Sequence, residues 1–201
     1  DAGEEPHDRY SYGRGNWFAA VGREHKAARE AAVLFDQSSF AKFEFSGRDA
    51  EAALSFIAAN DVARPVGHLV YTQMLNARGG IEADLTVARL AADRYYVVTG
   101  TGFATHDFHW IASNIPEGLD ARLTDVTSQN AVLVLMGPNA RDILEKLTRD
   151  DISNAAFPFG RARRLSVAGC PVLALRVTYV GELGWELHVP SEFALTLYDA
   201  L

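Results

Sequence analysis

The stretch Gly79-Gly80-Ile81-Glu82-Ala83-Asp84-Leu85-Thr86-Val87 is the part of the sequence that says most about the fold. A Gly-Gly pair permits the positive φ angles of a tight turn, and the residues after it alternate between apolar and polar side chains. This alternation predicts a half-buried strand with Asp84 on its polar face. Because strands disfavour aspartate, we expect Asp84 either to face solvent or to have a function.

The rest of the sequence predicts an α+β fold, with mixed or antiparallel sheets and flanking helices. We expect a loop or arm over residues 1–22 and connecting structure over residues 119–128. We expect helices over residues 23–34, 48–60, 103–114, 138–148 and 192–201, with Thr101 as an N-cap and Pro138 at a first helical position. We expect strands over residues 40–45, 69–76, 81–90, 94–99, 131–136, 161–168, 172–179 and 185–189.

Two segments, residues 43–50 and 134–140, share the pattern of a strand, a glycine turn and the start of a helix. The repetition fits two similar half-units that enclose a ligand, and it also fits a local pattern that is common in proteins. In the first case the chain divides into two subdomains, residues 1–48 with 125–201 and residues 49–124. Because the chain starts at Asp1 and ends inside a predicted helix, we expect it to be part of a longer polypeptide.

The composition indicates a globular protein that does not bind nucleic acid. The 201 residues are 48% hydrophobic and 22% charged, and the formal net charge of −7 disfavours contact with nucleic acid or an anionic membrane surface. No apolar run approaches the ~20 residues that span a bilayer. The single cysteine, Cys170, excludes a disulfide framework. His106 and His109 lie one helical turn apart without an evident third ligand, so no metal site is predicted.

A second carboxylate is placed by its glycine neighbours. Gly181 and Gly184 flank Glu182 between two predicted strands, with Tyr179 and Trp185 nearby. A carboxylate accepts two parallel hydrogen bonds, so it matches a planar N–H/NH₂ edge such as a guanidinium or the 2-amino-pyrimidinone edge of a pterin. From the residues alone, this segment is either such a binding turn or an ordinary hairpin turn with a solvated glutamate.

Three motifs in order resemble one family, the folate-binding module of the glycine-cleavage T-protein (aminomethyltransferase) type. They are Tyr71-Thr72 with the strand that carries Asp84, Leu135-Met136-Gly137-Pro138, and Tyr179-Val180-Gly181-Glu182-Leu183-Gly184-Trp185-Glu186. The segments at residues 14–18 and 35–40 are more similar to the version found in dimethylglycine and sarcosine dehydrogenases and oxidases. The resemblance covers nearly the whole chain and implies the aminomethyltransferase folate-binding fold without its final β domain.

The resemblance also implies roles for particular residues. Asp84 matches the family's catalytic aspartate, which orients or deprotonates the amine nucleophile of folate, although the family often has two acids where this chain has Ala83 and Asp84. Glu182 matches the glutamate that binds the pterin, and Tyr71 and Tyr179 match residues that line the pocket. Thr99 stands at a folate-contacting position where T-proteins commonly carry Asn.

The implied cofactor is tetrahydrofolate, and FAD would belong only to a domain outside this chain. The implied reaction transfers a one-carbon unit from an oxidised N-methyl amine of the dimethylglycine or sarcosine type and gives 5,10-methylenetetrahydrofolate. The implied partner is an FAD-dependent amine-oxidising domain in the same or another chain, in the bacterial cytoplasm or the mitochondrial matrix. A stand-alone glycine-cleavage aminomethyltransferase and a non-catalytic folate-binding regulatory module are the alternatives.

Two further patterns are given other interpretations. Residues 97–105 contain Gly-x-Gly between a strand and a helix, but Thr105 occupies the third glycine position of a dinucleotide fingerprint, so a turn is the better interpretation. The basic segment at residues 161–164 is typical of a solvated strand face, and contact with a folate polyglutamate tail is the alternative.

Overall fold

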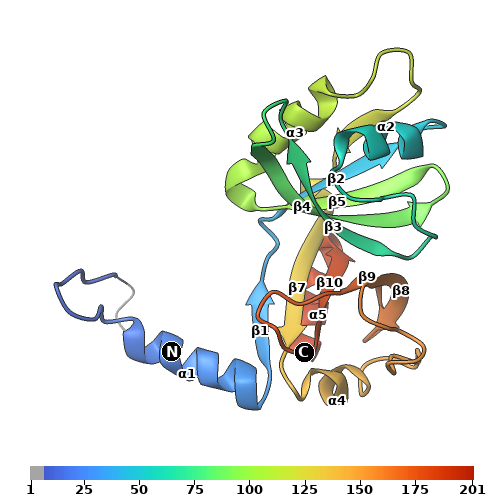
Figure 1. The fold of residues 1–201 in the computed structure, drawn as a ribbon. Helices are drawn as coiled ribbons and strands as arrows, with labels where there is room; N and C mark the ends of the chain where they lie inside the picture. The colour runs from blue at the N-terminus through green and yellow to red at the C-terminus, as the bar shows by residue number, and fades with distance from the viewer. Residues whose placement is uncertain (1–6) are drawn as a thin grey trace.

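The computed structural model describes residues 7–201, which form two five-stranded antiparallel sheets (Figure 1). Sheet A has the order β1(Val33–Asp36)-β7(Asn130–Met136)-β10(Gly184–Pro190)-β9(Cys170–Arg176)-β8(Arg161–Val167). Sheet B has the order β3(Leu69–Leu75)-β4(Ile81–Ala91)-β5(Arg94–Thr99)-β2(Ala41–Ser46)-β6(Arg122–Asp125). The predicted α+β class, with antiparallel sheets and flanking helices, is confirmed.

Each sheet buries one face under helices, and each has its own apolar core. In sheet B, the helices α2(Ala50–Ile57) and α3(Ala104–Ser113) cover the core that contains Phe43 and Tyr95. In sheet A, α4(Ala140–Leu144) and α5(Ala194–Ala200) pack against the core that contains Trp185. Short 3₁₀ turns occupy Thr101–Phe103, Thr127–Gln129 and Ser191–Phe193. No helix in the described part of the chain is long and apolar enough to cross a membrane.

The two sheets meet through a smaller cluster and a buried lysine. Tyr96 and Val98 of sheet B pack with Ala162 and Leu175 of sheet A. Lys42 on β2 is fully buried, and its Nζ donates hydrogen bonds of 2.8 Å to the carbonyl oxygens of Ser38 and Asn130. Ser38 lies where the chain passes from β1 of sheet A to β2 of sheet B, and Asn130 lies where it returns to sheet A at the start of β7. Lys42 on β2 therefore contacts both connections between the two sheets.

The β3–β4 hairpin is formed as predicted, with Gly79 at φ +78° in its turn. Along β4 the side chains of Ala83, Leu85 and Val87 are buried, whereas Asp84 is exposed, so the predicted alternation is confirmed there. Ile81, the first apolar residue of this alternation, departs from it: it is 67% exposed at the start of the strand.

The N-terminal elements differ from the prediction. Part of the expected arm over residues 1–22 lies outside the described residues, and the rest leads into α1(Phe18–Glu30), which extends away from both sheets (Figure 1). The expected helix over 23–34 therefore begins earlier and ends earlier. Val33–Asp36 instead forms β1, because its short apolar run pairs with the buried strand β7.

Three local predictions were also wrong. The connecting segment 119–128 contains β6, whose mostly exposed polar sequence gives no alternating signal. Helix α4 is shorter than expected and begins after Pro138, because Gly137 adopts φ +129° before it. Thr101 does not cap the helix with its side chain; its Oγ1 donates to Ser39 Oγ at 3.0 Å.

The chain first passes from sheet A to sheet B between Asp36 and Ala41, because β1 belongs to sheet A and β2 to sheet B. The division into two subdomains, residues 1–48 with 125–201 and residues 49–124, stays a prediction.

Candidate functional site

Asp84 and Tyr71 meet on the exposed face of the β3–β4 hairpin. Asp84 pairs with Gln73 in the antiparallel register and Tyr71 pairs with Thr86, so Tyr71 and Asp84 are diagonal neighbours on one face. The Tyr71 hydroxyl donates to Asp84 Oδ2 at 2.8 Å, and this hydrogen bond raises the pKa of Tyr71 above its ordinary value. Tyr71 is 61% exposed and Asp84 is also exposed, so the pair is open to a ligand. The strand holds the carboxylate, and the tyrosine orients it.

Thr99 lies at the end of a chain of polar contacts that passes through Asp107 and His106 of α3 to Glu82 on β4. Its buried hydroxyl donates to Asp107 Oδ2 at 2.6 Å, and Asp107 Oδ1 lies 3.0 Å from His106 Nδ1. His106 Nε2 is 3.4 Å from Glu82 Oε2, and Glu82 Oε1 accepts a 2.7 Å hydrogen bond from the side chain of Asn76. The hydroxyl hydrogen of Thr99 is therefore committed within the protein, and the side chain is buried.

His106 and Asp107 of α3 connect Thr99 on β5 with Glu82 on β4. The contact with Asp107 is the main cause that raises the pKa of His106, and the charge of Glu82 adds to it. Asp107 is 1% exposed, which is unusual for a charged side chain without a structural or functional role. The available signal in the sequence was an acid in the first turn of a helix that follows Thr99 closely.

Glu182 lies in the loop between β9 and β10, where Gly181 adopts φ +87°. Its Oε1 lies 2.6 Å from a terminal guanidinium nitrogen of Arg29, in the last turn of α1. A guanidinium is one of the two planar partners that the sequence predicts for this carboxylate, and here the chain supplies it. Tyr179 in the same loop is 91% exposed.

A further group of contacting polar side chains could not be predicted from the sequence, because two of its members are far apart along the chain. His188 on β10 is buried, and its Nδ1 lies 3.2 Å from the hydroxyl of Tyr96 on β5. Its Nε2 lies 3.2 Å from Glu186 Oε2. The Tyr96 and His188 rings pack edge to face with centroids 5.3 Å apart, and burial raises the pKa of Tyr96. Through these contacts His188 of sheet A is connected to Tyr96 of sheet B.

The predicted site residues therefore form separate groups. Asp84 and Tyr71 lie together on the exposed face of sheet B, and Thr99 lies on β5 of the same sheet with its side chain bonded to Asp107 of α3. Glu182 and Tyr179 belong to the loop that enters β10 of sheet A. Within residues 7–201, no three His, Cys, Asp or Glu side chains gather in a way that could hold a metal ion, and Cys170 is buried. The chemistry available is that of carboxylates, tyrosine hydroxyls and histidine, which can bind and move protons.

Comparison with known proteins places these features in one family. The GCVT N-terminal domain matches residues 4–201. The chain is 36% identical over 200 residues to the mitochondrial dimethylglycine dehydrogenase of Homo sapiens, and the aligned region covers 99% of this chain and 23% of that protein. It is 41% identical over 199 residues to the 4-methylaminobutanoate oxidase (formaldehyde-forming) of Paenarthrobacter nicotinovorans, and that aligned region covers 99% of this chain and 24% of that protein.

The chain thus spans about a quarter of the length of these curated relatives. Among solved structures, the glycine cleavage system aminomethyltransferase T of Bartonella henselae superimposes with a TM-score of 0.78 at 27% identity, covering 89% of this chain and 47% of that one. The match confirms the aminomethyltransferase type of fold that the sequence motifs implied. The chain belongs to the family defined by the GCVT N-terminal domain, the glycine-cleavage T-protein type.

Proposed function

We propose that this chain is part of a tetrahydrofolate-binding module that transfers a one-carbon unit from an oxidised N-methyl amine to tetrahydrofolate, giving 5,10-methylenetetrahydrofolate. The observation that carries the proposal is the open carboxylate of Asp84, held on a rigid strand and oriented by Tyr71 at 2.8 Å. The names of two relatives, dimethylglycine dehydrogenase and 4-methylaminobutanoate oxidase (formaldehyde-forming), support an N-methyl amine as the source of the carbon.

The residues fit such a ligand to different degrees. Asp84 and Tyr71 are exposed on a sheet face and can approach a ligand without rearrangement. Glu182 has one oxygen in contact with Arg29, so its other oxygen is the one available to a pterin amino group. Tyr179 is exposed and can cover a ring, whereas Thr99 is buried and donates its hydroxyl hydrogen to Asp107.

Bound tetrahydrofolate would supply the nucleophilic amine that takes up the one-carbon unit. The chain's own contribution is at Asp84, whose carboxylate accepts a proton from that amine and places negative charge beside the cationic carbon unit. Tyr71 donates to one carboxylate oxygen and leaves the other oxygen free for the proton. Through these contacts, the protein orients the amine and assists its deprotonation.

The module would act with an FAD-dependent amine-oxidising domain in the same chain or in a partner chain. The names dehydrogenase and oxidase among the relatives support this association, as does the small share of their length that the chain covers. A mitochondrial matrix or bacterial cytoplasmic location goes with the same proposal, since the human relative is named mitochondrial and another relative is bacterial.

The test compares one-carbon transfer with folate binding in the complete protein, using Asp84→Asn. We expect formation of methylenetetrahydrofolate to fall by about 10²-fold or more, the range of general acid–base catalysis, while the affinity for 5-formyltetrahydrofolate stays close to that of the unchanged protein. Asp93→Asn is the matched control, because Asp93 is an exposed acid in the turn between β4 and β5. Folate binding with unchanged transfer would contradict the catalytic role and favour a non-catalytic folate-binding module.

A second candidate is the stand-alone aminomethyltransferase of the glycine cleavage system. The structural match to the Bartonella henselae enzyme favours it. The two candidates differ in the donor, so an assay with an aminomethyl group on a lipoyl carrier protein separates them. Transfer from that carrier would support the second candidate, and transfer only from an oxidised N-methyl amine would support the first.

A further inference from the structure

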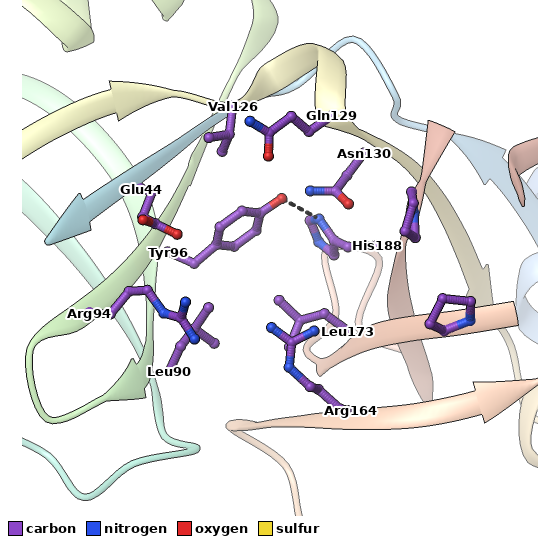
Figure 2. A pocket seen from close by; sticks show the side chains of 12 residues that line it. Glu44, Leu90, Arg94, Tyr96, Val126, Gln129, Asn130, Arg164, Leu173 and His188 are labelled. Atoms are coloured by element: carbon purple, nitrogen blue, oxygen red, sulfur yellow. Dashed lines mark hydrogen bonds between the residues drawn. The ribbon is translucent and has the colours of Figure 1, made fainter. Parts of the chain in front are cut away.

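A cavity of about 230 Å³ lies between the two sheets, away from Asp84 and Tyr71 (Figure 2). Its walls are built by two rows of paired residues. On sheet A, His188 pairs with Leu173 and Leu173 pairs with Arg164, so these three side chains form one row across β10, β9 and β8. On sheet B, Glu44 pairs with Tyr96 across β2 and β5. The antiparallel register thus places side chains from five strands around one space, and those from four of the strands are polar.

Two arginines enter this space without a partner. Figure 2 shows the guanidinium groups of Arg94 and Arg164 directed into the cavity from opposite sheets. Arg94 Nε is buried and has no hydrogen-bond acceptor. Neither guanidinium forms a hydrogen bond or ion pair with any residue in the range 7–201. By contrast, Arg89 donates to three backbone carbonyls and pairs with Glu51 at 2.6 Å.

This arrangement leaves the buried Nε of Arg94 without a protein acceptor and directs a second, exposed guanidinium, that of Arg164, at the same space. An unsatisfied buried donor costs free energy, and two like charges that face the same space repel each other. An oxyanion would accept hydrogen bonds from the arginines and offset the repulsion between their charges, because a guanidinium group binds carboxylate and phosphate oxygens with paired hydrogen bonds. The formal net charge of −7 makes general attraction of anions by the surface a poor explanation, so binding would depend on these particular side chains.

Further polar side chains and one acid complete the lining. The Tyr96 hydroxyl and the His188 imidazole lie 3.2 Å apart at the wall of the cavity, and Asn130 contributes a side-chain amide. Glu44 is half-buried in the wall and, within the described part of the chain, has no side-chain partner either. It would repel a second anionic group, so the ligand's remaining atoms should be neutral or cationic.

We propose that this inter-sheet cavity is a binding site for a small oxyanion, a carboxylate or a phosphate, held between Arg94 and Arg164. Its volume is below the ~300–1,000 Å³ of sites for drug-sized ligands, so the occupant has only a few heavy atoms. The site is separate from the transfer chemistry proposed for Asp84, and its occupancy does not depend on folate.

Calorimetric titration of the full chain with propionate and with inorganic phosphate tests the proposal. We expect saturable binding of at least one of them, with a Kd of about 1 mM or tighter. Arg94→Gln and Arg164→Gln should each weaken binding by about tenfold or more, because each removes one of the two guanidinium groups. Arg122→Gln is the matched control, since Arg122 is an exposed arginine of sheet B outside the cavity.

Glu44→Gln provides a test of opposite sign, because removing the single acid should tighten anion binding. Thermal unfolding of each variant shows whether it is folded, and Arg94→Lys, which keeps the charge, should retain part of the affinity if Arg94→Gln proves unstable. If neither probe binds saturably, or if Arg122→Gln weakens binding as much as the cavity variants, the proposal is wrong. Preference between propionate and phosphate identifies which oxyanion the cavity takes.

Discussion

Lys42 is expected to be one of the main contributors to the stability of the two-sheet arrangement. Its ammonium group is completely buried and reaches two carbonyl oxygens, those of Ser38 and Asn130, at 2.8 Å each. Burial lowers the pKa of Lys42, and the nearby charges of Asp125 and Asp36 act against this shift. The perturbation we choose is Lys42→Met, which keeps most of the length and the apolar stem of the side chain and removes the ammonium group with its hydrogen-bond donors and its charge.

The expected cost follows from the two carbonyls that lose their partner. An unsatisfied buried acceptor costs about 1–3 kcal/mol, so two of them cost about 2–6 kcal/mol. Part of this is offset because the variant no longer buries a charge, which leaves a net loss of about 2–4 kcal/mol in the free energy of unfolding.

Urea unfolding monitored by tryptophan fluorescence and circular dichroism measures this difference. Lys146→Met is the control, because Lys146 is exposed and its replacement should change the free energy of unfolding by less than about 0.5 kcal/mol. A loss below about 1 kcal/mol in Lys42→Met, or a loss equal to that of the control, would refute the reasoning that the buried ammonium joins the two connections between the sheets.

Two other variants test local features. Asp107→Asn should lower the pKa of His106 in an NMR titration, because the contact at 3.0 Å with Asp107 is the main cause of its raised value. The pKa of His106 is raised in the folded state above the ordinary 6.5, so the stabilisation from His106 is complete below pH 6.5 and is lost as pH rises through the folded-state pKa. The difference in the free energy of unfolding between the unchanged protein and Asp107→Asn should therefore shrink as pH rises through this window. A difference that does not depend on pH would contradict the assignment. Gly137→Ala should reduce the free energy of unfolding by about 2 kcal/mol or more, because Gly137 has φ +129° and an added Cβ would lie 2.5 Å from the Ala31 carbonyl oxygen. Gly102→Ala, with nothing within 4 Å of its added Cβ, is the control, and equal effects of the two substitutions in thermal unfolding would show that the close approach is unimportant.

The local features of the site could be predicted from the sequence because they depend on neighbours along the chain. The Gly-Gly turn and the alternation after it predicted the β3–β4 hairpin and put Asp84 on the exposed face. Tyr71 and Asp84 are on consecutive strands of one hairpin, so their meeting follows from its register. The resemblance of the motifs to the T-protein family led to the same pair.

Other contacts join parts of the chain that no local pattern relates. Glu182 contacts Arg29 across 153 positions of the sequence, and His188 contacts Tyr96 across 92. Strand β1 was missed for the same reason, since four residues become a strand only because β7 lies beside them. Arg164 is exposed, as expected for a solvated strand face, and the packing of the two sheets also places it at a cavity. These features depend on tertiary structure, which outweighs local propensity.

The consecutive strands β1 and β2 belong to different sheets, and this affects how the chain folds during synthesis. Every strand of sheet B lies within residues 41–125, so this sheet can form while the C-terminal half is still being made. Strand β1 has to wait for β7, since Val33 pairs with Met136, and at 5–20 residues per second the delay is about 5–20 s. During that interval the apolar residues of β1 lack their partner strand on the nascent chain. The slow step of folding should accordingly be the late closure of sheet A around β7, and a ribosome-bound chain halted before residue 130 should bind a chaperone through the segment 33–36.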